Sequence, residues 1–259
     1  MAAVEKLKGE ELMPVLKVSG LIFSYGPRPL IQDLSFELRS GDFMCVLGPN
    51  GSGKSTLLKL LTGFMKASSG SVKLGGREVS SIEPGRLARL AAYVASETST
   101  PYDFSVRETV LLGRTARAGF WRGYRAEDGK AAGLAMEETG ITALAERSIN
   151  TLSTGERQLV FIAQALAQEA GLLLLDEPTS HLDLKYKAEI MALLARLGRR
   201  GLAVAAVLHE PALARLGCNK ALLLNGGGAY SFGAESEMLA PERLAAAYGL
   251  PIDSPLLPK

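Results

Sequence analysis

The chain has 259 residues, of which 47% are hydrophobic and 22% charged, a composition typical of a globular protein with a large core. Its 29 basic and 27 acidic side chains leave a net charge of +2, which argues against a protein that wraps nucleic acid. The longest apolar runs, at residues 172–175 and 202–208, are far shorter than the roughly 18 residues that a membrane span requires. We therefore expect one α/β domain with a smaller inserted or appended part, and a membrane role only through a partner.

The N-terminal stretch MAAVEKLKGEELMP carries acids throughout and has no continuous apolar run, so we expect no secretory signal. Cys45 and Cys218 each lie beside an apolar stretch, and the sequence has no Cys/His cluster with metal-ligand spacing. We expect buried free thiols in a reducing compartment.

Strand patterns fill the first part of the chain. Residues 15–24 (VLKVSGLIFS) and 31–38 (IQDLSFEL) flank a Gly-Pro-Arg-Pro turn and predict an antiparallel pair. Residues 43–47 (FMCVL) form a continuous apolar run, as expected for a strand buried on both faces. Residues 71–79 (SVKLGGREV) predict another hairpin, with the Gly-Gly pair at its turn.

Helical patterns follow. Apolar residues recur at helical spacing after residue 56, at Leu57, Leu58, Leu60, Leu61 and Phe64. Residues 105–146 are rich in Ala, Glu and Arg and predict a helical insertion. Apolar runs at 171–176, 202–208 and 221–224, separated by helices, predict a parallel sheet with its active site at the carboxyl ends of the strands. A short helical tail is expected from Ser236.

A glycine-rich stretch, GPNGSGKST, follows the predicted strand at 43–47. Gly48, Gly53, Lys54 and Ser55 fit the phosphate-binding pattern G-x-x-x-x-G-K-[ST]. Glycines let backbone N–H groups turn inward around an oxyanion, and the helix N-terminus favours the same charge. Lys54 is placed to reach the β- and γ-phosphates, and Ser55 to bind Mg²⁺. The residues expected to cradle the nucleotide are Gly48, Pro49, Asn50, Gly51, Ser52, Gly53, Lys54, Ser55 and Thr56. A plain glycine turn is the alternative.

Two acids, Asp176 and Glu177, end the apolar run at 172–175. We expect Asp176 to hold the Mg²⁺ hydration shell and Glu177 to orient and deprotonate the attacking water. Because a residue before proline is pushed toward extended conformations, Pro178 should make Glu177 project from the strand end. His209 ends another apolar run and should reach the same edge, to bind the γ-phosphate or position the water. The alternatives are a pair of solvated, helix-capping acids and a structural histidine.

Together these motifs resemble the ATP-binding subunit of ABC transporters over nearly the whole chain. Residues 152–158 (LSTGERQ) resemble the family's signature motif LSGGQ-R-Q, with Thr and Glu replacing Gly and Gln. Residues 172–183 (LLLLDEPTSHLD) resemble its Walker B strand and D-loop, and His209 matches its switch histidine. Tyr25 matches the aromatic residue that stacks on adenine, the alternative being a core aromatic of the hairpin.

The resemblance implies an α/β fold: a P-loop NTPase core with a mainly parallel sheet, an N-terminal antiparallel β-subdomain and an inserted α-helical subdomain. One ABC ATPase domain would span 1–259, with the core and β-subdomain at 1–95 and 151–235, the helical subdomain at 96–150 and a tail at 236–259. It also implies ATP and Mg²⁺ as cofactors and a head-to-tail homodimer. In that dimer one copy covers the nucleotide of the other with Ser153, Thr154, Gly155 and Glu156. Considered by structure alone, this segment is a good helix cap.

Within the family, the segments 108–120, 162–184, 205–214 and 241–251 are most similar to ATPases of importers for iron-siderophore, haem, cobalamin or related metal chelates. This implies an ATPase, converting ATP and water to ADP and phosphate, that energises a separate permease and, through it, works with a substrate-binding protein. The expected location is cytoplasmic, peripheral on the inner face of the membrane. No nucleic acid is expected. The alternatives are a soluble ABC-type ATPase acting on nucleic acid or ribosomes, and a degenerate nucleotide-binding regulatory module.

One feature departs from the family pattern, and a second can be interpreted in more than one way. Ser96, followed by Glu97, stands where the family has a glutamine that contacts Mg²⁺ and links hydrolysis to the permease. A serine reaches the metal only through a water, so either Glu97 substitutes or coupling is weakened. Residues 113–125 (GRTARAGFWRGYR) interleave arginines with aromatics, which suits nucleic acid; a solvated, partly anchored loop is the alternative. The resemblance favours a surface that faces the permease and the anionic leaflet.

Overall fold

The computed structural model describes residues 13–96, 102–118 and 123–254. Its strands are β1 (Leu16–Phe23), β2 (Ile31–Leu38), β3 (Phe43–Leu47), β4 (Ser69–Leu74), β5 (Arg77–Glu78), β6 (Ala91–Val94), β7 (Leu172–Leu175), β8 (Ala203–Val207), β9 (Lys220–Gly226) and β10 (Ala229–Ala234). Its α-helices are α2 (Lys54–Leu61), α3 (Pro84–Leu87), α4 (Val106–Leu111), α5 (Thr115–Ala118), α6 (Ala126–Glu138), α7 (Thr154–Ala167), α8 (Leu184–Arg199), α9 (Pro211–Ala214), α10 (Glu235–Met238) and α11 (Pro241–Tyr248). Short 3₁₀ helices are η1 (Val79–Ser81), η2 (Leu112–Arg114), η3 (Thr142–Leu144) and η4 (Ile149–Thr151).

The smaller sheet is antiparallel and has the order β2-β1-β4-β5. Leu16 of β1 lies opposite Leu38 on one side and Leu74 on the other, so the apolar faces of the three strands are in register. Gly75 and Gly76 form the turn between β4 and β5 with φ of 52° and 77°, values that glycine adopts without strain. Both predicted hairpins are therefore confirmed.

The larger sheet has the order β10-β9-β3-β8-β7-β6. β3 pairs in parallel with β8 and β9, and β7 pairs in parallel with β6 and β8, so their carboxyl ends share one edge, as predicted. The pattern of the sequence did not indicate β6 or the antiparallel edge strand β10. β6 has only four residues and β10 (AYSFGA) is rich in small residues, so pairing with β7 and β9 decides their conformation.

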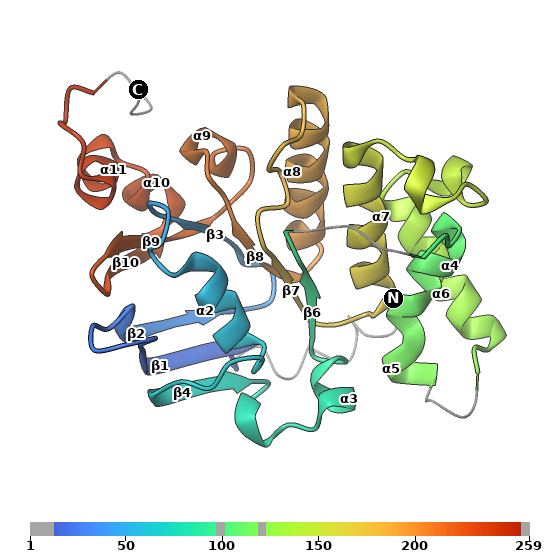
Figure 1. The fold of residues 1–259 in the computed structure, drawn as a ribbon, viewed down its shortest axis with the longest axis horizontal. Coiled ribbons are helices and arrows are strands. Elements are labelled where there is room, and N and C mark those ends of the chain that lie inside the picture. The colour runs from blue at the N-terminus through green and yellow to red at the C-terminus, as the bar shows by residue number, and fades with distance from the viewer. Residues whose placement is uncertain (1–12, 97–101, 119–122, 255–259) are drawn as a thin grey trace.

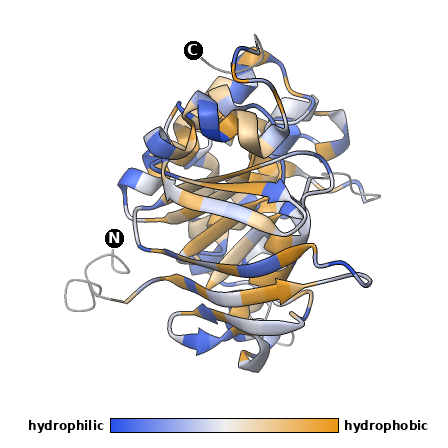
Figure 2. Cartoon of the chain, turned by 90° about the vertical axis from the view of Figure 1, so that its left-hand side faces the viewer, coloured by the Kyte–Doolittle hydropathy of each residue, from blue (hydrophilic) through white to orange (hydrophobic). Residues whose placement is uncertain are grey.

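The larger sheet forms the middle of three layers (Figure 1). Met44 and Val46 of β3 face a hydrophobic cluster shared with the antiparallel sheet and α2. Phe43 and Cys45, which alternate with them, belong to a second cluster with α7 and α8. Figure 2 shows the apolar colour concentrated along the strands. Cys45 and Cys218 are both free and buried, as predicted.

The helical insertion is confirmed for the part of it that the structure describes, where α4, α5 and α6 gather beside α7 on the right of Figure 1. Two helix starts, at Ser105 and Ser153, are closed by capping boxes in which the serine side chain accepts from a backbone N–H. One expectation is wrong. Phe64 lies beyond the end of α2 and is 71% exposed, because α2 ends at Leu61 and Gly63 with φ 71° turns the chain away.

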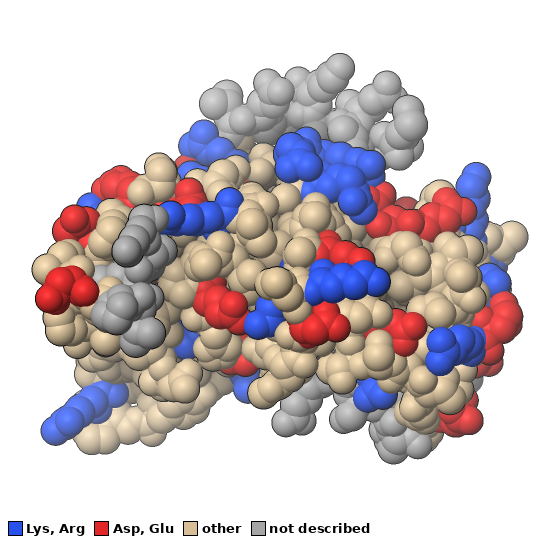
Figure 3. Space-filling view, turned by 90° about the horizontal axis from the view of Figure 1, so that it is seen from above, with Lys and Arg blue, Asp and Glu red and all other residues tan. Residues whose placement is uncertain are grey.

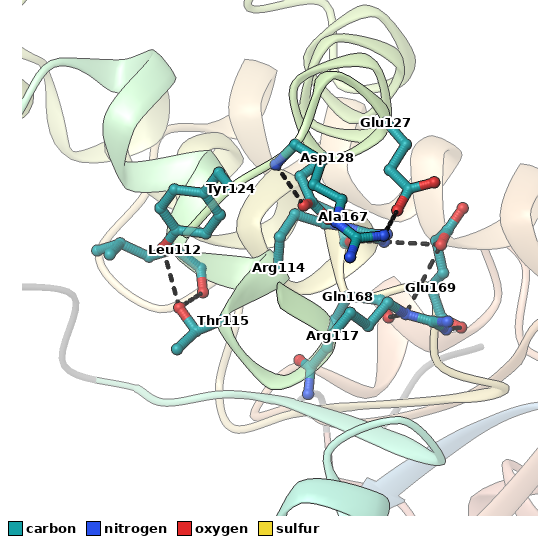
Figure 4. A network of polar contacts seen from close by, with 11 residues as sticks. Leu112, Arg114, Thr115, Arg117, Tyr124, Glu127, Asp128, Ala167, Gln168 and Glu169 are labelled. Carbon is teal, nitrogen blue, oxygen red and sulfur yellow. Dashed lines mark hydrogen bonds and ion pairs between the residues drawn. The ribbon is translucent and has the colours of Figure 1, made fainter. Parts of the chain in front are cut away.

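A buried arginine network ties the helical insertion to the chain that leads into β7 (Figure 4). Arg114 is 6% exposed; its Nε donates to Asp128 Oδ1 at 3.0 Å, and its Nη1 donates to the Ala167 carbonyl at 2.7 Å and to Glu169 Oε2 at 2.6 Å. Arg117 donates to the carbonyls of Gln168 and Glu169. Arg114 and Arg117 thus make internal contacts, whereas Arg125 is exposed, so the described part of residues 113–125 agrees with the interpretation as a solvated, partly anchored loop. Residues 119–122 lie outside the described ones.

Candidate functional site

The phosphate loop connects the end of β3 to the start of α2. Gly48, Gly51 and Gly53 have φ of 148°, 77° and 100°, a region that residues with a Cβ avoid. At Gly48 a Cβ would lie 2.3 Å from the Leu224 carbonyl oxygen. Gly53 caps α2 without a side-chain hydrogen bond, which leaves the first N–H groups of the helix facing outward. The loop therefore has the glycine conformations that its motif requires.

A cavity of about 440 Å³ opens over this loop, and the residues around it fit a polyphosphate. Lys54 Nζ donates to the carbonyls of Gly48 and Pro49 at 2.8 and 2.9 Å, so its ammonium already lies over the loop. Burial lowers the pKa of Lys54, and the charges of Glu177 and Asp176 oppose this. The Ser52 hydroxyl is buried without a hydrogen-bond partner among the described residues. The cavity is lined by Tyr25, Leu30, Asn50, Gly51, Gly53, Lys54, Ser55, Thr56 and Glu177.

Tyr25 lies at the edge of the cavity with 69% of its surface exposed. Its hydroxyl is 3.3 Å from the Thr56 hydroxyl, and its ring meets the ring of Phe23 edge-on at 4.9 Å between centroids. The side chain is anchored at one edge and leaves most of its ring free. A core position, the alternative interpretation of Tyr25, is excluded by this exposure.

Asp176 follows β7 and is 3% exposed. Ser55 donates to its Oδ1 at 3.0 Å and the Tyr93 hydroxyl to its Oδ2 at 3.3 Å. Burial raises the pKa of Asp176; the Ser55 hydrogen bond opposes this and the charge of Glu177 adds to it. A cation beside Asp176 would stabilise the carboxylate. The carboxylate and hydroxyl oxygens at this position are ligands of the kind that Mg²⁺ prefers. The sequence patterns did not indicate Tyr93, because they did not indicate β6.

The sequence predicts an extended backbone at Glu177, and this prediction is wrong. The φ of Glu177 is 54°, so the residue is left-handed and not extended, despite the proline that follows. This turn lets its carboxylate meet His209 Nε2 at 2.7 Å and accept from the Ser180 hydroxyl at 3.1 Å. These contacts offset a backbone conformation that costs about 1–3 kcal/mol. Burial raises the pKa of Glu177, but His209, Ser180 and Lys54 outweigh it and hold that pKa below its ordinary value.

The segment 153–156 opens α7, away from the phosphate loop of its own chain. Ser153 and Glu156 form the expected capping box, with Ser153 N and Oγ donating to Glu156 Oε2 at 2.8 and 2.9 Å. A Cβ at Gly155 would lie 2.3 Å from the ring of Tyr186, so this glycine is also required by packing within the chain. Within the described residues, this segment does not line the cavity over the phosphate loop.

Ser96 follows β6 and is exposed, near the edge where Asp176 lies. No hydrogen bond of its side chain is found among the described residues. Glu97, the candidate substitute for the missing glutamine, lies outside the described part of the chain. Within that part there is no group of three or more His, Cys, Asp or Glu side chains arranged to hold a metal.

A family model described as ABC transporter matches residues 31–180. The ferric enterobactin transport ATP-binding protein FepC of Escherichia coli strain K12 is 36% identical over 249 residues, which are 96% of this chain and 89% of that protein. The hemin import ATP-binding protein HmuV of Streptomyces coelicolor is 39% identical over 235 residues, covering 90% of this chain and 83% of that protein.

Solved structures agree with these relatives. One described as an inward-facing conformation of a metal-chelate type ABC transporter has a TM-score of 0.82 at 34% identity and covers 92% of this chain and 90% of that chain. The structure of cbiO1 from Clostridium perfringens, part of the ABC transporter complex cbiONQ, has a TM-score of 0.78 at 27% identity, covering 89% and 92%.

Proposed function

The chain belongs to the ABC transporter family, as an ATP-binding subunit that hydrolyses ATP to power transport, and from this membership we propose that it energises metal-chelate import. The cargo class would be an iron-siderophore, haem, cobalamin or related chelate. The names of its relatives, which concern ferric enterobactin and hemin, support this class. The subunit works with a membrane permease, and a substrate-binding protein would deliver the chelate to that permease.

We propose that ATP binds in the cavity over the phosphate loop. Its phosphates would accept from the free backbone N–H groups within residues 50–56 and from Lys54, which would exchange its carbonyl contacts for the β- and γ-phosphates. Tyr25 would stack on the adenine through its free ring face, a contact of roughly 1–3 kcal/mol. Mg²⁺, bound with ATP, would screen the charge of the phosphates; Ser55 would hold it directly and Asp176 through a water.

Glu177 would orient the attacking water and accept its proton. Its pKa is held below the ordinary value, so at neutral pH the carboxylate is ionised and able to act as a base. His209 would keep that carboxylate in place through the 2.7 Å contact, and its position at the end of β8 also allows it to reach the γ-phosphate. The single observation that carries the proposed ATP hydrolysis is that five residues lie together at one edge of the sheet: Lys54, Ser55, Asp176, Glu177 and His209.

A second copy of the chain would complete the site. The segment Ser153, Thr154, Gly155 and Glu156 opens the 14-residue helix α7, where free N–H groups and the helix dipole favour an anion. It does not line the cavity of its own chain, which supports a role across a head-to-tail dimer. In this proposal the core comprises 1–95 and 151–235, the helical subdomain 96–150 and the tail 236–259.

The permease would dock beside the helical subdomain. A cavity of about 550 Å³, away from the phosphate loop, lies between α3, β6, η2 and α7, and Phe161, Leu112 and Tyr93 are among its lining residues. Such an apolar groove suits a short segment of a partner protein. None of the described helices is long and apolar enough to cross a bilayer. We therefore propose a cytoplasmic subunit held at the inner membrane face by its permease.

An ATPase acting on nucleic acid or ribosomes finds less support, because Arg114 and Arg117 are engaged in internal contacts. On the face seen in Figure 3, basic and acidic side chains are interspersed, with no continuous basic surface across it. A degenerate regulatory module, suggested by Ser96, predicts binding without turnover.

One set of measurements tests these functions. We expect the purified chain to bind and hydrolyse ATP, without stimulation by nucleic acid, and to co-purify with a polytopic membrane protein. Stimulation of turnover by RNA or DNA would favour the nucleic-acid ATPase. ATP binding with no turnover, alone or with the permease, would favour the regulatory module. Failure to retain ATP would overturn the proposal.

A further inference from the structure

The C-terminal helix contacts the first glycine of the phosphate loop. Gly48 N donates to the hydroxyl of Tyr248 at 3.2 Å, across 200 positions of sequence. Tyr248 is the last residue of α11 and lies outside the region that the family model matches. Burial raises the pKa of Tyr248 and outweighs the opposing hydrogen bond from Gly48, so the hydroxyl stays protonated at neutral pH, as in an ordinary tyrosine.

The position of this hydroxyl is set by packing. Leu244, Ala245 and Ala247 of α11 are buried in the same hydrophobic cluster as Ala221 and Leu223 of β9. In Figure 1, α11 lies close to β9, the neighbour of β3 in the sheet. Gly249, with φ 65°, ends the helix directly after Tyr248. The tyrosine therefore lies at the end of a helix whose buried face and C-terminal end are fixed.

Gly48 has little freedom to find another partner for its N–H. The residue is buried, and the space beside its Cα is filled by the Leu224 carbonyl and the Ser52 hydroxyl, which a Cβ would approach to 2.3 and 2.9 Å. Without the Tyr248 hydroxyl, a buried backbone N–H would be left unpaired, which is costly. The loop would have to shift to expose that N–H to water.

The two peptide groups that flank the Gly48 Cα each bond to a side chain. Tyr248 accepts from the N–H on one side, and Lys54 Nζ donates to the carbonyl on the other at 2.8 Å. In the proposed function Lys54 leaves this carbonyl for the phosphates. Tyr248 then remains as the side-chain contact that holds the start of the loop.

We propose that Tyr248 is a positioning residue for the phosphate loop, through which the C-terminal helix sets the affinity for nucleotide. This inference rests on the proposed function for its ligand, ATP. It deepens that function by giving the tail a role in the site. Tyr248 does not touch the reacting atoms, so its loss should weaken binding while turnover at saturation is largely kept.

Tyr248→Phe removes the hydroxyl and keeps the ring. We expect the Kd for ATP, measured by titration without Mg²⁺, to rise about tenfold, with kcat at saturating MgATP changed less than about twofold. The matched control is Tyr230→Phe, which also removes a hydroxyl with two backbone contacts, to Ser35 N and the Asp33 carbonyl, but outside the site. Its Kd for ATP should equal that of the wild type.

Amide hydrogen exchange in the nucleotide-free protein tests the same contact without ATP. We expect Tyr248→Phe, but not Tyr230→Phe, to accelerate exchange in the peptide that contains Gly48. An unchanged Kd in Tyr248→Phe, an unchanged exchange rate, or equal effects of the two variants would overturn the inference and leave the proposed function intact. A wild-type chain that exchanges as expected but binds no ATP would overturn the proposed function instead.

Discussion

His209 Nε2 lies 2.7 Å from Oε1 of Glu177, and the two residues follow the ends of adjacent parallel strands, β8 and β7. Because parallel strands end at one edge of a sheet, side chains distant in sequence meet there. The contact orients the carboxylate and explains how Glu177 is held with a φ of 54°. It joins the candidate base to the residue that we propose as a contact of the γ-phosphate.

Replacing the base should separate binding from chemistry. We expect Glu177→Gln to lower ATP turnover by roughly 10²–10⁴-fold, because an amide cannot accept the proton of the attacking water. ATP binding should persist, since Lys54 and the loop are unchanged. The control is Glu210→Gln, which alters a half-exposed acid paired with Lys187. Full turnover in Glu177→Gln, measured by phosphate release, would require a different base.

Because Ser96 stands in place of the family's glutamine, we expect hydrolysis in this protein to require a higher Mg²⁺ concentration. We expect Ser96→Gln to lower the Mg²⁺ concentration for half-maximal turnover by about fivefold, the worth of one additional hydrogen bond near the metal. Titrating Mn²⁺ against the ATP complex, observed by its paramagnetic resonance, should show a matching gain in affinity. Ser80→Gln, at an exposed serine outside the cavity, is the control. If neither the rate nor the metal dependence changes, this expectation is refuted.

Gly155 should tolerate no side chain while Tyr186 is present. A Cβ there would lie 2.3 Å from the Tyr186 ring, so Gly155→Ala should reduce the free energy of unfolding by about 1–3 kcal/mol. Gly133→Ala, in α6, adds a methyl group that would have no atom within 4 Å, so this variant should instead be neutral or stabilising. Urea unfolding measures both. If Tyr186→Ala fails to lessen the effect of Gly155→Ala, the packing explanation is wrong.

The buried pair of Arg114 and Asp128 should contribute a pH-dependent stability. Hydrogen bonds from the Arg125 backbone and from Arg114 hold the pKa of Asp128 below its ordinary value. A carboxyl with a lowered pKa stabilises the fold above its unfolded pKa of about 3.9, and this contribution is lost as the pH falls through the folded value. At pH 7 we expect Asp128→Asn to lower the free energy of unfolding by about 3 kcal/mol, because it leaves a buried arginine charge partly unpaired.

The difference between wild type and Asp128→Asn should shrink as the pH is lowered below about 4, which urea unfolding across that range measures. Glu127→Gln is the matched control on the same helix. Its side chain is 71% exposed and lies 3.7 Å from Arg125, so a change below about 0.5 kcal/mol is expected. A difference for Asp128→Asn that is independent of pH would contradict the assignment.

Local spacing was sufficient to predict much of the fold and the centre of the candidate site. The pattern around Gly48 and Lys54 describes one turn between a strand and a helix, and such a turn depends on neighbours in sequence. Alternation and apolar runs likewise indicated β1, β2, β3, β7, β8 and β9. His209 could be assigned to the same edge as Asp176 because parallel strands share an edge.

The contacts that the patterns did not predict join segments far apart in the chain. Tyr248 meets Gly48 across 200 positions, and Tyr93 meets Asp176 across 83, because the order of strands in the sheet brings them together. The sequence did not show which arginine of residues 113–125 is anchored; Arg114 is buried because Asp128 and Glu169 compensate its charge. Glu177 is left-handed because His209 and Ser180 outweigh the local preference before proline. A turn or a helix start depends on residues adjacent in sequence, so the sequence alone can predict it. The partner of a buried polar group depends on which distant segments pack together, so only the tertiary structure decides it.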